Sequence, residues 1–307
     1  MADNLLYGKI IRGVAGFYYV NVENEGVFEC RARGIFRNKR EKPLPGDNVG
    51  IMPLVSEKRD GYPQGSMEKI LVRKNEIIRP SAANIDQAMV VFALAWPDPN
   101  LNLLDRFLVM MDEQAIPCII VFNKNDLVDE SKTKGIIKAY ADCGSKVLDV
   151  STMNLNDREK LLTCLKGKTT LLAGPSGVGK SSIMNLINPD ADTQTGTLSE
   201  KIGRGKNTTR HTEIFYVERG TYILDTPGFS SIYIDDIKPQ DLRFYFEEFK
   251  AYTDKCRFNS CVHISEPDCA VKKAVSEGKI STIRYENYKQ LYSEISVRRR
   301  GNNDSRR

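Results

Sequence analysis

The feature that most constrains this chain of 307 residues is a glycine-rich octapeptide in its second half. Residues 174–181 are Gly-Pro-Ser-Gly-Val-Gly-Lys-Ser, after the apolar stretch Thr169–Ala173 and before a helical pattern over Ser181–Ile187. Glycines let successive backbone N–H groups curl around a phosphate, and the helix N-terminus adds a favourable dipole. A glycine-rich turn can match this spacing by chance, but the strand before it and the helix after it favour a phosphate-binding loop. In such a loop Lys180 reaches the β- and γ-phosphates and the Ser181 hydroxyl ligates Mg²⁺.

The surrounding region has the sequence pattern of an α/β domain. Helical stretches, such as Glu159–Leu165 and the spacing of Leu104, Phe107, Leu108 and Met111, alternate with short apolar stretches. Strand–helix alternation implies a parallel sheet with helices on both faces. The expected strands are Ala88–Ala95, Cys118–Phe122, Lys146–Val150, Thr169–Ala173 and Thr221–Leu224.

A tetrapeptide at the end of the second of these strands points to guanine. Residues Asn123-Lys124-Asn125-Asp126 have the form Asn-Lys-x-Asp. A carboxylate at Asp126 can accept from both N1–H and the exocyclic amine of guanine, a donor pair that adenine lacks. The Lys124 stem can pack on the face of the base. Alone, this motif is weak evidence for guanine binding, because polar loops after strands are common. In the same domain as a phosphate loop, it becomes strong evidence.

Two further strand ends complete the expected nucleotide site. Asp225-Thr226-Pro227-Gly228 follows the last strand, so that Asp225 would hold Mg²⁺ through a water and the Gly228 N–H would meet the γ-phosphate. At Val150-Ser151-Thr152 a backbone amide could contact the guanine oxygen, which is a weaker signal. The predicted GTP-binding residues are Asn123, Lys124, Asn125, Asp126, Ser151, Gly174, Pro175, Ser176, Gly177, Val178, Gly179, Lys180, Ser181, Ser182, Asp225 and Gly228.

The order of these motifs is permuted. The base-recognition motif precedes the phosphate loop by about fifty residues, whereas in ordinary GTPases it follows the loop. A circular permutation preserves the site when the native termini lie close together. The segment after Asp225 then runs straight into the C-terminal part of the chain, so nucleotide state can bias the position of that part.

Two regions with different sequence patterns flank this domain. Before residue 80, turn residues separate five short strand patterns, which suggests a small closed barrel of the OB type that often binds nucleic acid. After residue 235 the pattern is helical, over Gln240–Phe249 and Ser281–Ser296. We therefore predict three domains: an RNA-binding OB-type barrel over 1–78, a permuted GTPase over 79–235 and a helical zinc-binding domain with a basic tail over 236–307. The barrel strands are expected at Lys9–Arg12, Phe17–Val22, Val27–Arg33, Asn48–Leu54 and Met67–Val72.

Four potential metal ligands cluster between the two C-terminal helices. Cys256, Cys261, His263 and Cys269 lie within fourteen residues, and four soft ligands with no open position suit a structural Zn²⁺ site. The other four of the seven cysteines lie in strand or helix patterns and are expected in the core: Cys30, Cys118, Cys143 and Cys164.

Charge and hydropathy bear on partners and location. The net charge of +5 divides into +4 over residues 1–80, −3 over 81–235 and +4 over 236–307. Basic flanks suggest an anionic partner, although a solvated surface and an arginine-rich tail explain them equally well. The longest apolar run, Ala88–Trp96, is too short for a membrane span, and no signal peptide is visible. We therefore expect a cytoplasmic protein with reduced cysteines.

With these motifs in place, the chain resembles the ribosome small-subunit-dependent GTPase A family, also called RsgA, YjeQ or YloQ. The resemblance covers nearly the whole chain and implies an OB-fold, a permuted GTPase and a zinc domain. It further implies late maturation of the small (30S) ribosomal subunit, with rRNA binding and with GTP hydrolysis stimulated by that subunit. Thr208-Thr209 fits the family's Thr-Thr motif, one residue of which would complete Mg²⁺ ligation beside Ser181 and Asp225.

The residue that activates water stays open. Ras-like enzymes place a glutamine just after the Asp-x-x-Gly element, where this chain has Phe229. A histidine further along, proposed as catalytic in some relatives, aligns with Asp236. His211, beside the threonine pair, is a weak catalytic candidate, and a solvent-exposed or RNA-contacting histidine is the alternative.

Two other functions compete with a subunit-assembly GTPase. A zinc-containing RNA-binding module would use GTP only as a conformational latch, and turnover in the presence of the small subunit would separate the two. A phosphate-loop kinase would leave Asn123–Asp126 without a purpose. The expected partners are the 30S subunit with its rRNA and GTP or GDP, with no membrane, and we expect a monomer.

Overall fold

The computed structural model describes residues 5–34, 36, 41–54, 61–77, 81–189, 212–225, 234 and 237–304, with side chains up to residue 298. The chain divides into two compact units. Unit 1 comprises Met1–Gln87, Arg158–Ala173 and Ser181–Pro227, and unit 2 comprises Ala88–Asp157, Gly174–Lys180 and Gly228–Arg307.

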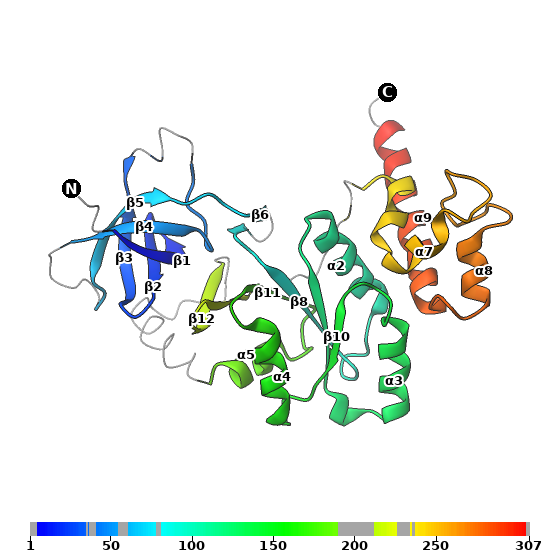
Figure 1. Cartoon of the computed structure of the whole chain (residues 1–307), viewed down its shortest axis with the longest axis horizontal. Coiled ribbons are helices and arrows are strands. Elements are labelled where there is room, and N and C mark those ends of the chain that lie inside the picture. The colour runs from blue at the N-terminus through cyan, green and yellow to red at the C-terminus, as the bar shows by residue number, and fades with distance from the viewer. Residues whose placement is uncertain are drawn as a thin grey trace. The chain divides into compact units, whose positions relative to one another are not determined.

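The N-terminal part of unit 1 is a closed five-stranded barrel, as predicted (Figure 1). Its strands follow the order β1-β2-β3-β5-β4, and all neighbours pair antiparallel except β3 and β5. Alternate side chains point inward, so that Ile10, Val20 and Ile51 are fully buried in the barrel core. The strands are β1 (Leu6–Val14), β2 (Phe17–Val22), β3 (Gly26–Ala32), β4 (Asn48–Pro53) and β5 (Gln64–Ile70).

The predicted α/β sheet is also present, with one strand that the sequence pattern did not indicate. The strand order is β10-β9-β8-β11-β13-β12, and β12 pairs antiparallel with β13 at the edge. The pairs β8–β9, β9–β10 and β11–β13 are parallel. The strands are β8 (Gln87–Ala93), β9 (Cys118–Asn123), β10 (Lys146–Asp149), β11 (Thr169–Ala173), β12 (Glu213–Glu218) and β13 (Thr221–Asp225), and a short ribbon pairs β6 (Glu76–Ile77) with β7 (Ala82–Ala83).

Four of the predicted helical stretches are helices in the structure, and one is not. Helices α3, α7 and α8 were not predicted. The pattern predicted one helix over Gln240–Phe249, but the chain forms two 3₁₀ segments, η2 (Pro239–Tyr245) and η3 (Glu247–Phe249). Phe246 between them is extended and fully buried, so packing of its ring breaks the helix. The α-helices are α2 (Leu101–Glu113), α3 (Glu130–Ala139), α4 (Asn156–Leu165), α5 (Lys180–Ile187), α7 (Lys250–Thr253), α8 (Ala270–Ser276) and α9 (Thr282–Asp304), with a 3₁₀ turn η1 (Asn125–Leu127).

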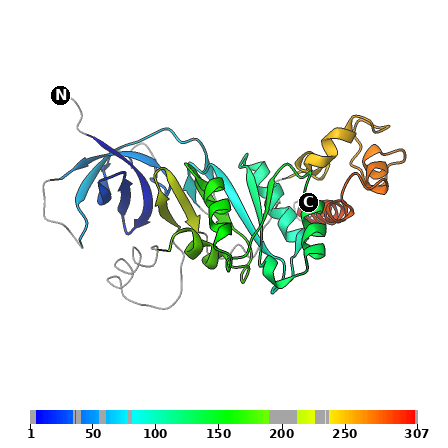
Figure 2. The ribbon, with the colours of Figure 1, turned by 60° about the horizontal axis from the view of Figure 1, so that its bottom comes forward.

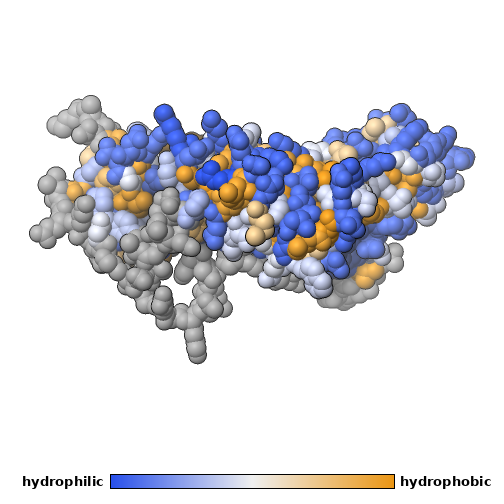
Figure 3. Space-filling view, turned by 90° about the horizontal axis from the view of Figure 1, so that it is seen from below, coloured by the Kyte–Doolittle hydropathy of each residue, from blue (hydrophilic) through white to orange (hydrophobic). Residues whose placement is uncertain are grey.

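No helix among the described residues is long and apolar enough to span a membrane. On the face drawn in Figure 3, hydrophilic and hydrophobic residues are intermingled. Such mixing is ordinary for a folded protein, since apolar atoms still contribute much of its surface.

Helices α2 and α9 pack against each other within unit 2 (Figures 1 and 2). A buried ionic cluster joins them. The Arg284 guanidinium is 1% exposed and donates to Glu248 at 2.7 and 3.0 Å and to Asp105 Oδ1 at 2.5 Å. Asn287 Nδ2 donates to the other oxygen of Asp105 at 2.7 Å. Burial raises the pKa of Asp105, and the charge of Arg284 opposes that rise. One arginine therefore compensates two buried carboxylates.

Replacing Arg284 with methionine is expected to lower the free energy of unfolding by about 3–5 kcal/mol, because it leaves two carboxylates buried without a cation. Urea denaturation followed by circular dichroism measures the loss. The matched control is Arg298→Met on the same helix, whose partner Glu294 lies at 2.8 Å on the surface. That change should cost less than about 1 kcal/mol. Equal effects of the two changes would contradict the assigned role of the cluster.

Candidate GTP-binding site and metal centre

The phosphate loop occupies residues 174–180, between β11 and the start of α5. Three of its glycines have positive φ: Gly174 (141°), Gly177 (80°) and Gly179 (94°). A Cβ at Gly174 would lie 2.2 Å from the Val91 carbonyl oxygen, and one at Gly179 would lie 2.3 Å from Asn123 Nδ2. The loop thus needs glycine for both backbone conformation and space.

The loop lysine points back into the loop. Lys180 Nζ donates to the carbonyl oxygens of Gly174 at 2.8 Å and Pro175 at 2.7 Å. These contacts hold the ammonium against the backbone of the loop.

The base-recognition motif is fastened to the same loop. Asn123, the last residue of β9, is 1% exposed, and its Nδ2 donates to the Val178 carbonyl oxygen at 2.9 Å. Lys124 adopts a left-handed backbone conformation and donates through Nζ to the Gly177 carbonyl oxygen at 2.8 Å and to the carbonyl oxygen of Trp96. Two motifs 55 residues apart in sequence are therefore one structural unit.

Asp126 lies at the open side of this arrangement. It belongs to η1 and is exposed to solvent. Its neighbour Asn125 is fixed by a 3.2 Å hydrogen bond from Nδ2 to Asp149 Oδ2 and by its own N–H to the Val150 carbonyl oxygen. An anchored turn with an exposed carboxylate suits recognition of a base edge.

Ser151, the other residue expected near guanine, makes hydrogen bonds within the protein. Its N–H donates to Asp157 Oδ2 at 2.9 Å, and its Oγ accepts from the Met153 N–H at 3.1 Å. The sequence analysis did not identify Asp157, which orders this loop, because its role rests on one local hydrogen bond that no motif marks.

Only some of the expected Mg²⁺ ligands lie within the part of the chain that the structure describes. Ser181 and Ser182 open α5 and are exposed, and Asp225 is the last residue of β13. In the β11–β13 register Asp225 pairs with Leu172, so both parallel strands end at the same edge, where Ser181 follows. The predicted Thr208, Thr209, His211 and Gly228 lie outside the described residues, as do Phe229 and Asp236.

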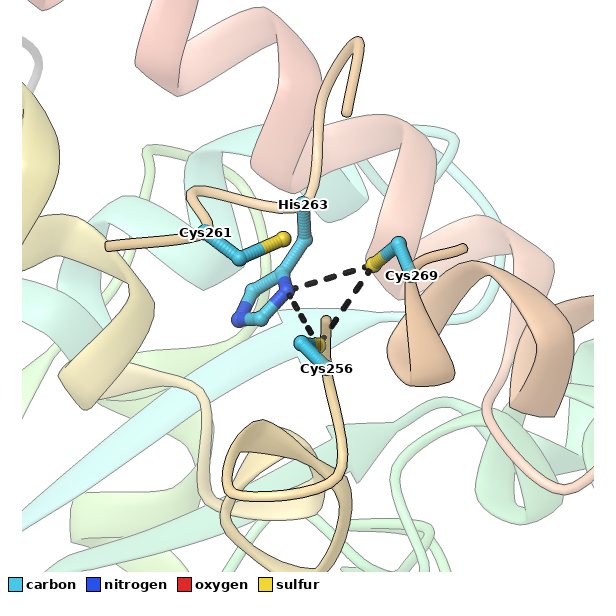
Figure 4. A group of neighbouring side chains, drawn as sticks. All are labelled: Cys256, Cys261, His263 and Cys269. Atoms are coloured by element: carbon cyan, nitrogen blue, oxygen red, sulfur yellow. Dashed lines mark hydrogen bonds between the residues drawn. The ribbon is translucent and has the colours of Figure 1, made fainter. Parts of the chain in front are cut away.

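The four predicted zinc ligands converge in unit 2, as Figure 4 shows. Their ligand atoms all lie within 4.8 Å of one another. His263 Nδ1 is 3.3 Å from Cys269 Sγ and 3.6 Å from Cys256 Sγ, and these two sulfurs are 3.9 Å apart. Tetrahedral Zn–S bonds of about 2.3 Å require a sulfur–sulfur separation near 3.8 Å. The Cys₃His cluster therefore fits a structural zinc ion.

The electrostatics of the cluster agree with a bound cation. Burial lowers the pKa of His263 to about 4, so the imidazole is neutral, as a metal ligand must be. Burial raises the pKa of the Cys261 thiol to about 12, so thiolates need a nearby cation to form. His263 Nε2 is buried without a hydrogen-bond partner among the described residues, and Nδ1 faces the sulfurs.

Residues that the sequence analysis missed hold the metal loop in place. Tyr285 and Tyr288 of α9 donate to the carbonyl oxygens of His263 at 2.7 Å and Val262 at 2.5 Å. The Glu266 carboxylate accepts from two loop amides, those of Val262 at 2.7 Å and Ile264 at 2.9 Å. Arg243 Nη1 donates to the carbonyl oxygen of Cys261 at 2.6 Å. The loop is thus tied to both the 3₁₀ segment and the long C-terminal helix.

A phosphate loop joined to an Asn-Lys-x-Asp motif that precedes it in sequence defines a circularly permuted GTP-binding protein. The profile described as RsgA GTPase matches residues 70–235, and that described as RsgA N-terminal domain matches residues 7–62. The chain belongs to the RsgA family of GTPases and is a GTP-hydrolysing enzyme.

Individual relatives extend over nearly the whole chain. Proteins named small ribosomal subunit biogenesis GTPase RsgA are 50% identical over 303 residues in Agathobacter rectalis and 45% identical over 293 residues in Alkaliphilus metalliredigens. Each alignment covers 95% of this chain and 99% of the relative. Among solved structures, YloQ, described as a circularly permuted GTPase, has a TM-score of 0.77 at 36% identity and 96% coverage of both chains. YjeQ from Thermotoga maritima has the same TM-score at 33% identity, covering 95% of this chain and 98% of that one.

Proposed function

We propose that this protein binds the small (30S) ribosomal subunit and its rRNA in the cytoplasm, assists late maturation of that subunit, and hydrolyses GTP with stimulation by it. The observation that carries the GTPase part is the docking of Asn123 and Lys124 onto the carbonyl oxygens of the phosphate loop. The ribosomal part is supported by relatives that share half of the sequence and are named for small-subunit biogenesis.

In this proposal GTP is bound by the phosphate loop and by the base motif, and Mg²⁺ by Ser181, Asp225 and one of Thr208 and Thr209. Lys180 neutralises charge on the β- and γ-phosphates, and Asp126 reads the guanine edge. When bound by these residues, Mg²⁺ would supply positive charge that offsets the negative charge of the phosphates. His211 stays a weak catalytic candidate, and the three domains are proposed with the boundaries 1–78, 79–235 and 236–307.

One structural zinc ion would be held by Cys256, Cys261, His263 and Cys269. Four protein ligands leave no open position, so the ion would order the C-terminal domain and take no part in hydrolysis.

Basic side chains beside aromatic rings support contact with RNA. On the barrel, the Arg31 guanidinium lies 4.7 Å from the ring centre of Phe17, and Lys69 Nζ lies 4.7 Å from that of Tyr7, which is 53% exposed. In the C-terminal domain a surface hollow is lined by four lysines and two carboxylates: Lys255, Lys272, Lys273 and Lys279, with Asp268 and Glu277. Glu277 pairs with Lys279 at 2.7 Å, so the hollow keeps a net positive charge. Phosphate contacts by cations with stacking on aromatic rings are the usual means of binding single-stranded RNA.

The test is a GTPase assay with and without purified small subunits. Without a water-orienting glutamine the isolated protein should turn over slowly, and subunits should raise the rate by at least about tenfold. Raising the salt concentration should weaken the stimulation, because phosphate contacts release counterions. Fast hydrolysis that subunits do not change would refute the proposal.

Point variants are preferable to deleting the barrel, because the barrel is built into unit 1. Lys9 Nζ lies 5.4 Å from the ring centre of Tyr222 in β13, and Arg12 Nη1 lies 3.6 Å from Glu213 in β12. Arg31→Gln with Lys69→Gln should reduce stimulation by subunits and leave the basal rate unchanged. Equal loss of both rates would indicate a folding defect and not a lost contact.

A further inference from the structure

The connection from β8 to α2 (Figure 1) contains the chain's one tryptophan, Trp96, beside the base-recognition motif. The carbonyl oxygen of Trp96 accepts a hydrogen bond from Lys124 Nζ. The next residue, Pro97, lies against the phosphate loop, since a Cβ added at Gly177 would be 3.6 Å from Pro97 Cδ. This connection therefore contacts both nucleotide motifs, although neither motif includes it.

The backbone of Trp96 is left-handed, with a φ of 47°. A bulky side chain disfavours this region, so the conformation costs free energy and persists only where other contacts impose it. Packing of the indole does not impose it, because Trp96 is 82% exposed. The contacts that hold the residue are made by the backbone. The Leu94 N–H donates to the Asn123 carbonyl oxygen at 2.9 Å, and the Trp96 carbonyl oxygen accepts from Lys124.

The ammonium of Lys124 is held by two carbonyl oxygens at once. Nζ donates to Gly177 in the phosphate loop at 2.8 Å and to Trp96 in the connection. Both acceptors belong to residues in the left-handed region, since Gly177 has a φ of 80°. Glycine adopts this region without steric cost, whereas tryptophan does not. The strained acceptor is thus the one that lies outside the sequence motifs.

Holding the ammonium also fixes the stem of Lys124. A lysine side chain loses much rotamer freedom when it packs against a ligand, and this loss weakens binding. Here the stem is fixed before any base arrives, because the residue has a left-handed backbone at one end and two acceptors at the other. The methylene groups of the stem are the apolar surface on which the face of a base can pack.

We propose that Trp96 is a positioning residue for guanine binding. Its left-handed backbone presents the carbonyl oxygen that holds Lys124 against the phosphate loop, so that the stem of Lys124 is in place for the face of the base. The inference rests on the proposed function for the role of Lys124 at the base. It assigns the effect to the backbone of Trp96 and not to the indole.

Two substitutions separate the backbone of Trp96 from its side chain. Trp96→Ile disfavours the left-handed region strongly, because isoleucine is branched at Cβ, whereas Trp96→Asn keeps that region accessible. In titrations with fluorescently labelled GDP, the isoleucine variant should bind at least about fivefold more weakly than wild type, since a hydrogen bond to a charged group is lost. The asparagine variant should bind within about twofold of wild type. Equal losses in the two variants would overturn the proposal in favour of the indole.

A double-mutant cycle tests whether Trp96 acts through Lys124. Lys124→Met removes the ammonium and keeps an apolar stem, so the Trp96 carbonyl oxygen has no donor left to hold. In this background Trp96→Ile should weaken GDP binding by less than about twofold. The same loss with and without the ammonium would overturn the proposal, because Trp96 would then affect GDP by another route.

The matched control is Ala115→Ile, which places isoleucine at another left-handed residue of unit 2. Ala115 has a φ of 54°, is exposed, and precedes the start of β9, whereas Asn123 ends that strand. Both isoleucine variants should lower the midpoint of thermal unfolding, and only Trp96→Ile should weaken GDP binding. Equal weakening by both would overturn the proposal in favour of a general loss of stability.

The same titrations distinguish this role from the proposed function. A wild-type protein that binds no GDP would refute the nucleotide site and the role of Trp96 with it. Tight binding by wild type and by Trp96→Ile alike would refute the role of Trp96 alone.

Discussion

Replacing Asp126 with asparagine is expected to weaken GTP binding by at least about 100-fold and to create binding of xanthosine triphosphate. The carboxylate accepts from two donors of guanine, N1–H and the exocyclic amine. An asparagine amide presents a donor in place of one acceptor, which suits xanthine because xanthine has an oxygen where guanine has its amine. Charged hydrogen bonds of this kind are worth about 1.5–3 kcal/mol each, so losing them accounts for the expected factor.

The structure indicates that this substitution tests base recognition separately from folding. Asp126 is exposed, and the turn that carries it is held by Asn123 and Asn125, so the change should alter recognition and not folding. Asp129→Asn is the matched control, because this carboxylate is also exposed and makes no capping hydrogen bond to α3. Titration with fluorescent GTP and xanthosine triphosphate analogues measures both affinities. If the Asp126 variant binds GTP as tightly as wild type, the base motif has been misassigned.

Features defined by local spacing could be predicted from the sequence. The phosphate loop and the Asn123–Asp126 motif each require a fixed run of residues, and their backbone conformations follow from that run. Cys256, Cys261, His263 and Cys269 are likewise close in sequence, so their convergence needs only one loop. The barrel and the parallel sheet followed from turn residues and apolar runs, because these reflect burial directly.

Features that depend on distant partners could not be predicted. Arg284 and Asp105 are 179 residues apart, and nothing near either one indicates a buried ion pair. The edge strand β12 was missed because its burial depends on β13 and on the barrel, and not on a clear alternation of its own. The break at Phe246 is likewise a result of packing that overrides helical periodicity.

Removing zinc is expected to unfold the C-terminal domain. Zinc in comparable small sites contributes about 10–16 kcal/mol of apparent binding free energy, and this is folding free energy when the site does not preexist. Here the ligands line the same core as the aromatic residues Phe249, Tyr285 and Tyr288, so loss of the ion would remove the support of that core. Cys261→Ala should therefore abolish the one zinc ion per chain and expose this domain to proteolysis.

GTP binding should survive the same change within about threefold. The hydrogen bonds that shape the phosphate loop and the base motif join residues between 96 and 180 and involve no residue of α9. When α9 unfolds, it no longer covers Asp105, so this carboxylate becomes hydrated and is not left buried without a partner. Helix α2 should therefore stay folded. Cys143→Ala is the matched control, since this thiol lies in unit 2 outside the cluster and should retain zinc. Zinc content, folding of the C-terminal domain and GTP affinity are measured by metal analysis, limited proteolysis and nucleotide titration. Each is compared between the wild type, the Cys261 variant and the Cys143 variant. A wild-type protein without zinc would remove the metal site, and a Cys261 variant that loses zinc and GTP binding together would show that the two sites depend on each other.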